Sequence, residues 1–411
     1  MTDRFGRLSR VRAPLLLSYA TFVFVGVSAG VAGVLLLTQM SDYGVDRATI
    51  GITFFTNSAG FVLAGLSNGA LIQRFSIRMV LALGGGAYVL AALYLATRPS
   101  FAAFVVVQFV TGYGCGVLES ALNTYISALP GATTLLNRLH AFFGVGALLG
   151  PVLAAWIVGF ASWTMVWLVL AVACVPLVAG FMAAFPGPVP AEPGSQAPEP
   201  GTHPADTSGS PTGSLLVAAL RDRGVLCGTA MLAVYVGLEI GVGNWGFSYL
   251  VQARGMTATL AGYAVSGYWL GLTGGRFLIS PVAARTRVTT AGMMYACLVG
   301  ITAAATLAWL SPTAAAASAA LVLLGFFLGP VFPTVMAITP QLTTPRLAPT
   351  AIGVMNAGGI MGGAGLPWLA GVIAQGTGIW TLLPFSIALA MLQFAAWRPL
   401  AARTRPAPAR R

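Results

Sequence analysis

Two acidic residues lie inside long apolar stretches of the sequence, and they are the first candidates for chemistry. Glu119 and Glu239 remain after the other acids are assigned to loops, to the N-terminal tail or to a linker. A charge at the centre of a bilayer costs at least about 2.5–3.5 kcal/mol, so an unpaired carboxyl there tends to hold a proton. Exchange of that proton when water arrives is what proton coupling requires. We therefore predict that Glu119 and Glu239 are proton-coupling residues; the alternative is a neutral carboxyl that hydrogen-bonds between helices.

Amide and aromatic side chains accompany the two acids at helical spacing. Asn123 follows Glu119 by four residues and shares its helix face, and Tyr235 precedes Glu239 by the same spacing. Trp245 follows shortly after. Carboxyl and amide groups beside aromatic rings suit a hydroxyl-rich ligand, which they bind at its edges and by stacking. We predict that Asn123, Tyr235 and Trp245 contact a substrate, although a stripe of aromatics alone is more often core.

One histidine, His140, also falls in an apolar stretch. It titrates near neutral pH and could relay a proton or contact the substrate, while the alternative is a packing role. An internal repeat in the sequence aligns Asn356 with His140. We therefore predict that Asn356 also contacts the substrate. No carboxylate stands at metal-ligand spacing from His140, and the four cysteines are isolated in the sequence. We predict no metal and no cofactor.

Gly65 to Gly69 reads GLSNG and fits the G-x-S-x-G pattern of serine hydrolases. The pattern arises easily by chance in a chain with 51 glycines, and Ser67 falls within an expected helix rather than at a strand-to-helix turn. An intramembrane serine hydrolase is therefore a remote alternative. The sequence has neither a zinc-protease motif nor a phosphate-binding loop. We predict no enzymatic or catalytic residues.

The elements that must position these residues are membrane-spanning helices. The chain has 411 residues, of which 57% are hydrophobic and 7% charged, whereas a soluble domain has about a quarter charged. This composition excludes a water-soluble enzyme. Twelve apolar stretches are each long enough to cross a bilayer of about 30 Å as a helix. We expect an all-α polytopic membrane protein with spans at about 14–41, 49–73, 77–97, 101–129, 135–160, 163–185, 224–253, 257–283, 288–310, 314–341, 347–376 and 379–398.

A stretch rich in Pro, Gly and Ser divides the spans into two sets of six. Such a composition cannot bury enough apolar surface to fold and forms a solvated linker. We therefore predict an N-terminal bundle at 1–185, a linker at 186–214, a C-terminal bundle at 215–398 and a basic tail at 399–411.

The basic residues, all arginines, give the orientation and the net charge of +12. Arg47, Arg98 and Arg254 fall at one end of the expected spans and Arg276 lies within one, while the others fall at the opposite end. The positive-inside rule then places both termini and the linker in the cytoplasm, and we predict a multi-pass protein of the plasma (cytoplasmic or inner) membrane. Because the arginines punctuate apolar stretches, we predict a lipid partner and no nucleic acid. Arg74, Arg78 and Arg276 are candidates for topology or gating.

The two halves resemble each other in sequence. Aligning Pro151 with Pro367 superposes Gly146 on Gly362 and His140 on Asn356. A second match, at nearly the same offset, pairs two small-residue motifs, Gly112-x-x-x-Gly116 and Gly325-x-x-x-Gly329. Such glycines let helix backbones approach each other. Two matches at nearly the same sequence offset predict a duplicated six-helix bundle, as in transporters built from parallel repeats.

Six plus six spans around a central linker resemble the major facilitator superfamily. The segment from Gly69 to Arg78, GALIQRFSIR, is similar to the G-x-L-x-D-R-x-G-R-R signature that follows span two in that superfamily. Gln73 replaces its Asp and Ser76 its second Gly, and Gln108 stands at the usual Arg of span four. The resemblance implies two pseudo-symmetric bundles that transport a small solute.

Within the superfamily, the chain most resembles the fucose/proton symporter group. Leu118-Glu119-Ser-Ala-Leu-Asn123 is similar to its span-four motif, and the region from Asn137 through His140 to Pro151 is similar to span five. The resemblance implies that Glu119 corresponds to the acid that carries the proton. Two departures are that span one contains no acid and that Glu239 stands where the symporter has a Gln.

We therefore predict a monomeric, proton-coupled secondary transporter of a small polar solute, a sugar or related metabolite. It would alternate access by rocking its two bundles. The main alternative is a proton-driven efflux antiporter for a drug or metabolite, because Gly146-x-x-x-Gly150-Pro151 matches part of the antiporter motif of span five.

Overall fold

The computed structural model describes residues 2–185 and 212–403, and every regular element in these ranges is helical. The N-terminal half consists of α1 (Thr2–Tyr43), α2 (Arg47–Ile50), α3 (Ile52–Ala96), α4 (Phe101–Ser127), α5 (Ala132–Val158) and α6 (Trp163–Ala184). The C-terminal half consists of α7 (Thr212–Arg221), α8 (Arg223–Gln252), α9 (Ala258–Arg285), α10 (Thr290–Leu310), α11 (Ala314–Leu328), α12 (Val331–Leu342), α13 (Ala348–Thr377), a short 3-10 helix at Ile379–Thr381 and α14 (Leu382–Arg403).

These helices account for the twelve expected spans. Ten segments of the described chain are long and apolar enough to cross a membrane, and the segment 47–96 among them contains two spans joined by a bend. The bend lies at Ser76, whose backbone is not helical. The remaining span is α9, which has 28 residues and packs against α5 and α11. Large apolar side chains such as Leu90 and Val106 are mostly exposed, as expected of a surface that faces lipid.

Three boundaries differ from the expectations. Helix α7 begins at Thr212, within the residues assigned to the linker, because an apolar-periodic stretch begins directly after the last Pro-Gly-Ser segment. Helix α14 continues to Arg403, beyond the predicted end of the bundle at 398. The span at 314–341 is divided between α11 and α12 at Gly329-Pro330, where the proline cannot supply an N–H to the first helix.

The two halves pack their helices in the same way, which confirms the duplicated architecture. Gly146 on α5 lies against the backbone of Val23 on α1, and its counterpart Gly362 on α13 lies against Ala233 on α8. A Cβ atom at either glycine would overlap a carbonyl oxygen of the neighbouring helix. Close approach therefore requires glycine at both positions.

The second glycine motif repeats this relation. Gly112 on α4 lies against Asn57 on α3, and Gly325 on α11 lies against Tyr268 on α9. In each half, the fourth span thus packs tightly on the second. The sequence repeat therefore corresponds to a repeat of helix contacts.

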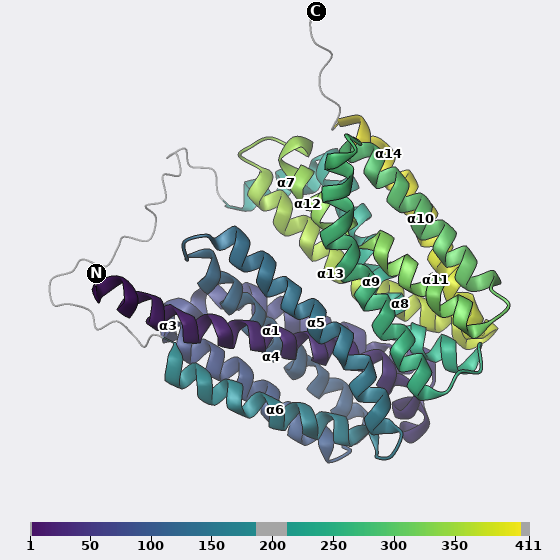
Figure 1. Cartoon of the computed structure of the whole chain (residues 1–411), viewed down its shortest axis with the longest axis horizontal. Helices are drawn as coiled ribbons and strands as arrows, with labels where there is room; N and C mark the ends of the chain where they lie inside the picture. Colours follow the sequence, from purple (N-terminus) through teal and green to yellow (C-terminus); the bar gives the residue numbers. More distant parts are fainter. Residues whose placement is uncertain (1, 186–211, 404–411) are drawn as a thin grey trace, which may run out of the picture.

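The two bundles lie side by side, the N-terminal bundle coloured purple to teal and the C-terminal bundle green to yellow (Figure 1). Contacts between them join α5 to α9, α1 to α8 and α3 to α13. We call the end of the bundles where α6 finishes and α7 begins the linker end, and the opposite end the far end. Helices α1, α8 and α13 finish at the far end, where α2 connects α1 to α3.

Candidate functional site

The charged centre of the C-terminal bundle is an ion pair between α8 and α9. Arg276 donates a hydrogen bond from Nη2 to Oε1 of Glu239 over 3.2 Å. The Glu239 side chain is only 11% exposed, whereas the Arg276 side chain is 32% exposed. The structure therefore pairs two residues that the sequence analysis treated separately, one as a proton site and the other as a topology or gating residue.

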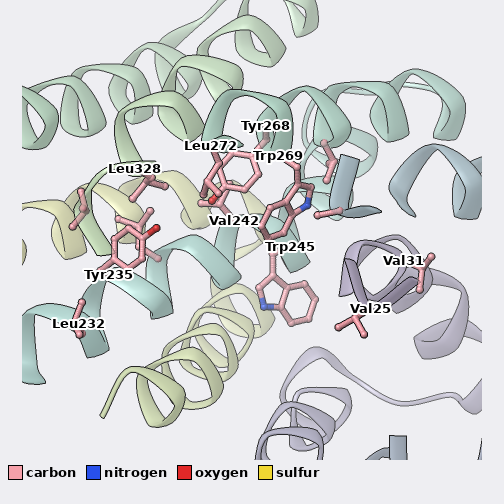
Figure 2. Packing of buried hydrophobic residues seen from close by; sticks show 14 of the residues in the cluster. Val25, Val31, Leu232, Tyr235, Val242, Trp245, Tyr268, Trp269, Leu272 and Leu328 are labelled. Atoms are coloured by element: carbon pink, nitrogen blue, oxygen red, sulfur yellow. The ribbon is translucent and has the colours of Figure 1, made fainter. Parts of the chain in front are cut away.

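Aromatic side chains surround this pair. The Tyr268 hydroxyl donates to the backbone carbonyl of Glu239 over 2.9 Å. Tyr235 is fully buried one turn before Glu239, and its charge interactions include both Glu239 and Arg276. Figure 2 shows Tyr235, Tyr268 and Trp269 projecting from α8 and α9 in this region. The face of α8 that carries Tyr235 and Glu239 therefore faces α9, and aromatic side chains of α9 pack against it.

Glu119 occupies a different environment in the N-terminal bundle. It lies half-buried on α4, one turn after Cys115, with which it interacts electrostatically. Within the described residues it makes no ion pair and no hydrogen bond. Asn123 lies one turn further along the same helix and is also half-buried. Glu119 is thus a membrane-embedded carboxyl without an ionic partner in the described part of the chain.

His140 lies on α5, which faces α9 across the contact between the bundles. Its ring meets Phe22 of α1 edge-on, with the ring centroids 5.4 Å apart, and its side chain is exposed. His140 also interacts electrostatically with Arg276 across the contact between α5 and α9. Its repeat counterpart, Asn356, is exposed on α13. The structure thus brings His140 toward Arg276 and Glu239.

Trp245 lies in the contact between the bundles near the far end. It is fully buried, and its indole N–H donates to the carbonyl of Pro367 over 2.8 Å. Its ring meets Phe54 of the N-terminal bundle edge-on at 6.1 Å. In Figure 2, Trp245 points from α8 toward α13, with Val25 and Val31 of α1 nearby. In this conformation Trp245 packs between helices; whether it contacts a substrate stays a prediction.

Polar contacts also join the bundles at the far end. The Arg47 guanidinium donates to Gln252 over 2.8 Å, and the Arg47 backbone N–H donates to Gln375 over 3.1 Å. Trp368 donates from its indole N–H to the carbonyl of Ala48 over 3.1 Å. These bonds hold the far ends of the two bundles together.

The remaining sequence candidates Arg74 and Arg78, together with Ser67 of the G-x-S-x-G pattern, all lie on α3. Arg74 is exposed with its guanidinium 5.3 Å from the centroid of the neighbouring Phe75 ring, and Arg78 is half-buried after the bend at Ser76. The Ser67 hydroxyl lies within 3.3 Å of the Tyr113 hydroxyl and of the Ala64 carbonyl on its own helix. Ser67 therefore has the environment of a helix-packing residue.

The pairing of Glu239 with Arg276 was not predicted, although the sequence contains a sign that Arg276 needs a partner. Arg276 is the one arginine assigned to the interior of a span, and a buried charge requires a compensating partner. With Glu119 and Glu239 as the embedded acids, one of them had to be that partner. The choice of Glu239 depends on the facing of α8 and α9, which the sequence does not show.

The fold defines a polytopic membrane protein built from two repeated helical bundles. The family model described as "Major Facilitator Superfamily" matches residues 17–367, and the chain belongs to that family.

Several curated proteins are similar to the chain. The "Bypass of stop codon protein 6" of Saccharomyces cerevisiae is 28% identical over 87% of this chain and 76% of its own length. The "Cis,cis-muconate transport protein" of Acinetobacter baylyi is 23% identical over 62% of this chain and 66% of its own length. The "Glucose/mannose transporter GlcP" of Bacillus subtilis is 24% identical over 37% of this chain and 38% of its own length.

Solved structures share the fold at low sequence identity. A bacterial homologue of the human lysosomal transporter Spinster, in an inward-facing and unoccupied conformation, has a TM-score of 0.76 at 14% identity and covers 97% of this chain and 99% of its own. A variant of the fucose:proton symporter FucP of E. coli has a TM-score of 0.60 at 17% identity and covers 96% of this chain and 99% of its own. These likenesses confirm the predicted two-bundle architecture.

Proposed function

We propose that the chain is a proton-coupled secondary transporter of a small polar solute, with Glu119 as the proton-carrying residue. The observation that supports this proposal most is the contrast between the embedded carboxyls. Glu239 is paired with the cation Arg276, whereas Glu119 has no cationic partner within the described residues. A half-buried carboxyl of this kind gains and loses its proton as its access to water changes.

The transport cycle follows from the contacts between the bundles. We propose that the termini and the linker are cytoplasmic, in accordance with the arginine distribution. The far end is then the external side, which Arg47, Trp368 and Trp245 close in this conformation. Rocking of the bundles would break these contacts and open the site outward. One chain contains both bundles and all the proposed site residues, so we propose a monomeric transporter in the cytoplasmic membrane.

The solute contacts would come from both bundles. Asn123 and His140 lie on the N-terminal bundle, and Tyr235 and Asn356 on the C-terminal bundle. We assign Trp245 to closure of the far end, because its N–H already has a partner. A sugar is supported by the fucose-type motifs and by the glucose/mannose relative, while the muconate relative supports an organic acid.

Uptake into proteoliposomes tests the role of Glu119. An inward gradient of one pH unit supplies about 1.36 kcal/mol per proton, enough for about tenfold accumulation with one coupled proton. We expect Glu119→Gln to lose this accumulation but to retain solute exchange at zero gradient. Asp46→Asn is the matched control, because it makes the same change at an exposed loop residue that caps α2. Accumulation by the Glu119→Gln protein at the wild-type level would refute the proposal.

Efflux is the second candidate. The "Multidrug resistance protein B homolog" of Mycobacterium tuberculosis (strain CDC 1551 / Oshkosh) is 27% identical over 36% of this chain and 28% of its own length, and the span-five motif resembles that of antiporters. The same proteoliposomes distinguish the two directions. An antiporter accumulates solute when the lumen is acidic, and a symporter does so when the outside is acidic.

A further inference from the structure

We propose that Arg276 is the centre of a binding site for a carboxylate group of the solute, and that Glu239 occupies this site in the absence of solute. The inference rests on the proposed transport function and narrows the chemical class of its solute. It starts from the donor capacity of Arg276, which exceeds what Glu239 uses.

The guanidinium of Arg276 has unused hydrogen-bond donors. An arginine carries five N–H donors in a planar fork that matches a carboxylate with two parallel bonds. Here a single hydrogen bond, 3.2 Å long, joins Nη2 to Glu239. The Nε atom is buried and has no acceptor among the described residues. The pair is therefore less complete than a two-bond arginine–carboxylate contact, and a solute carboxylate that displaces Glu239 can form both bonds with the guanidinium.

Two further buried groups on α8 and α9 lack hydrogen-bond partners in the described ranges, one beside the pair and one about two turns away. The Tyr235 hydroxyl lies near Glu239 and Arg276 but meets the geometry of a hydrogen bond with neither. The Trp269 ring packs against Gly243, one turn after Glu239, and its indole N–H has no acceptor in the described ranges. Tyr235 is 0% and Trp269 6% exposed. Figure 2 shows Tyr235 and Trp269 at separate positions along α8 and α9.

These unused groups identify the chemistry of the ligand. The Arg276 guanidinium only donates, and the Tyr235 hydroxyl can do so. An ionised carboxylate only accepts, so it satisfies donors without bringing donors of its own. A neutral sugar hydroxyl brings one donor for each oxygen and does not add the charge attraction of Arg276. These hydrogen-bond donors therefore favour an anionic ligand over a polyol.

The site is reachable from the contact between the bundles. The Arg276 side chain is 32% exposed, and the exposed His140 interacts with it from the N-terminal bundle. The half-buried ring of Phe332, whose centroid lies 6.1 Å from that of Tyr235, adds an apolar side chain to this region. A carboxylate with an aromatic or apolar body thus matches both the charge and the lining.

Ligand-dependent thermal unfolding of the full chain in lipid nanodiscs tests the inference. The probes are benzoate, 4-hydroxybenzoate and lactate, each paired with its neutral amide, together with L-fucose. We expect at least one carboxylate to raise the midpoint of unfolding and its amide to leave it unchanged. The dissociation constant of that carboxylate is then measured by titration calorimetry.

Variants of the pair decide the role of Arg276. Glu239→Gln removes the internal competitor, so we expect it to tighten carboxylate binding by about tenfold. The double variant Glu239→Gln/Arg276→Gln keeps a neutral, similarly shaped pair and should weaken binding at least tenfold. Arg285→Gln, at an exposed position on the same helix, is the matched control and should bind as the wild type does.

The outcomes separate this inference from the proposed function. Wild-type affinity in the double variant, or a response to L-fucose with none to any carboxylate, would overturn the carboxylate site and leave proton-coupled transport standing. Carboxylate binding that depends on Arg276, combined with unchanged gradient-driven uptake in Glu119→Gln, would support the site and overturn the proton role of Glu119.

Discussion

The N-terminal and C-terminal bundles have the same helix contacts but different charges. Gly146 and Gly362 bring α5 onto α1 and α13 onto α8 in equivalent ways. The embedded charges do not follow this symmetry. In the N-terminal bundle, Glu119 has no ionic partner among the described residues, whereas the C-terminal bundle holds Glu239 in a pair with Arg276.

The difference shows which features a duplicated fold repeats. Close contacts between backbones determine whether each bundle packs, so both halves need glycine at matching points. A charge is needed only where chemistry occurs, and each one adds a desolvation cost. At the offset of the glycine motifs, the position equivalent to Glu119 is Phe332, which lies beside Tyr235. The two bundles therefore share their architecture and divide the proposed functions of proton carriage and ligand binding.

The largest expected effect comes from breaking the pair in the C-terminal bundle. Arg276→Ala leaves the buried carboxylate of Glu239 uncompensated, and loss of one partner of a buried pair costs about 3–5 kcal/mol. Because Arg276 is partly exposed, we expect about 3 kcal/mol, the lower end of that range. Unfolding in denaturing detergent measures the change.

The same measurement on the N-terminal bundle sharpens the contrast. Glu119→Gln breaks no ion pair, so its effect on stability should stay within about 1 kcal/mol. The double variant Glu239→Gln/Arg276→Gln should recover most of the loss, because it leaves no unpaired charge. If Glu119→Gln destabilises the protein as much as Arg276→Ala does, then Glu119 has an ionic partner and the contrast between the bundles is wrong.

The sequence predicted the spans and the repeat well, because both depend on local composition. All twelve apolar stretches are helical, ten segments of the described chain are long and apolar enough to cross a membrane, and the glycines matched by the repeat lie at equivalent helix contacts. The pairing of Glu239 with Arg276 was not predicted, since it joins residues 37 positions apart through the facing of two helices. The type and spacing of Trp245 predict a ligand contact, which stays a prediction, but they do not predict how its indole packs between helices. In this conformation its N–H donates to the carbonyl of Pro367, a contact that only the tertiary packing of α13 determines.

A second comparison is between the strained backbone at Ser76 and the regular helix elsewhere in the N-terminal bundle. Ser76 stands where the superfamily signature has glycine, and its φ of 64° and ψ of 155° lie in a region that is essentially restricted to glycine. Such strain costs about 1–3 kcal/mol, and part of the gain from glycine is offset by its greater freedom in the unfolded chain. We expect Ser76→Gly to stabilise the protein by about 1 kcal/mol, measured as a rise in the unfolding midpoint.

A matched substitution in regular helix should have the opposite sign. Ser120 lies within α4, where glycine is less favourable than serine by about 0.5 kcal/mol, so Ser120→Gly should destabilise. Equal destabilisation by both substitutions would show that Ser76 is not strained. In the sequence, the one visible sign of this strain was the departure from the signature at that position.

The smallest expected effect concerns Asp222, which lies outside the spans at the start of α8. Burial would raise the pKa of Asp222, but hydrogen bonds from Thr343 and from the backbone N–H groups of Val225 and Gly224, with the charge of Arg403, together hold that pKa below its usual value. The folded pKa thus lies below the unfolded value of about 3.8, so this stabilisation is present above that pH and is lost as pH falls through the folded pKa.

Asp222→Asn should therefore reduce the acid sensitivity of the C-terminal bundle. Asparagine keeps the helix cap but loses the ionic contact with Arg403, which lies 3.9 Å away, and such contacts contribute about 0.5 kcal/mol. We expect the fall in unfolding midpoint between pH 7 and pH 3 to be smaller in Asp222→Asn than in the wild type. In the N-terminal bundle, Asp42 pairs with Arg98 at 2.7 Å at the far end, and Asp42→Asn serves as the comparison. If Asp222→Asn and the wild type lose the same stability at low pH, the ionised form of Asp222 does not stabilise the contact between α8, α12 and α14.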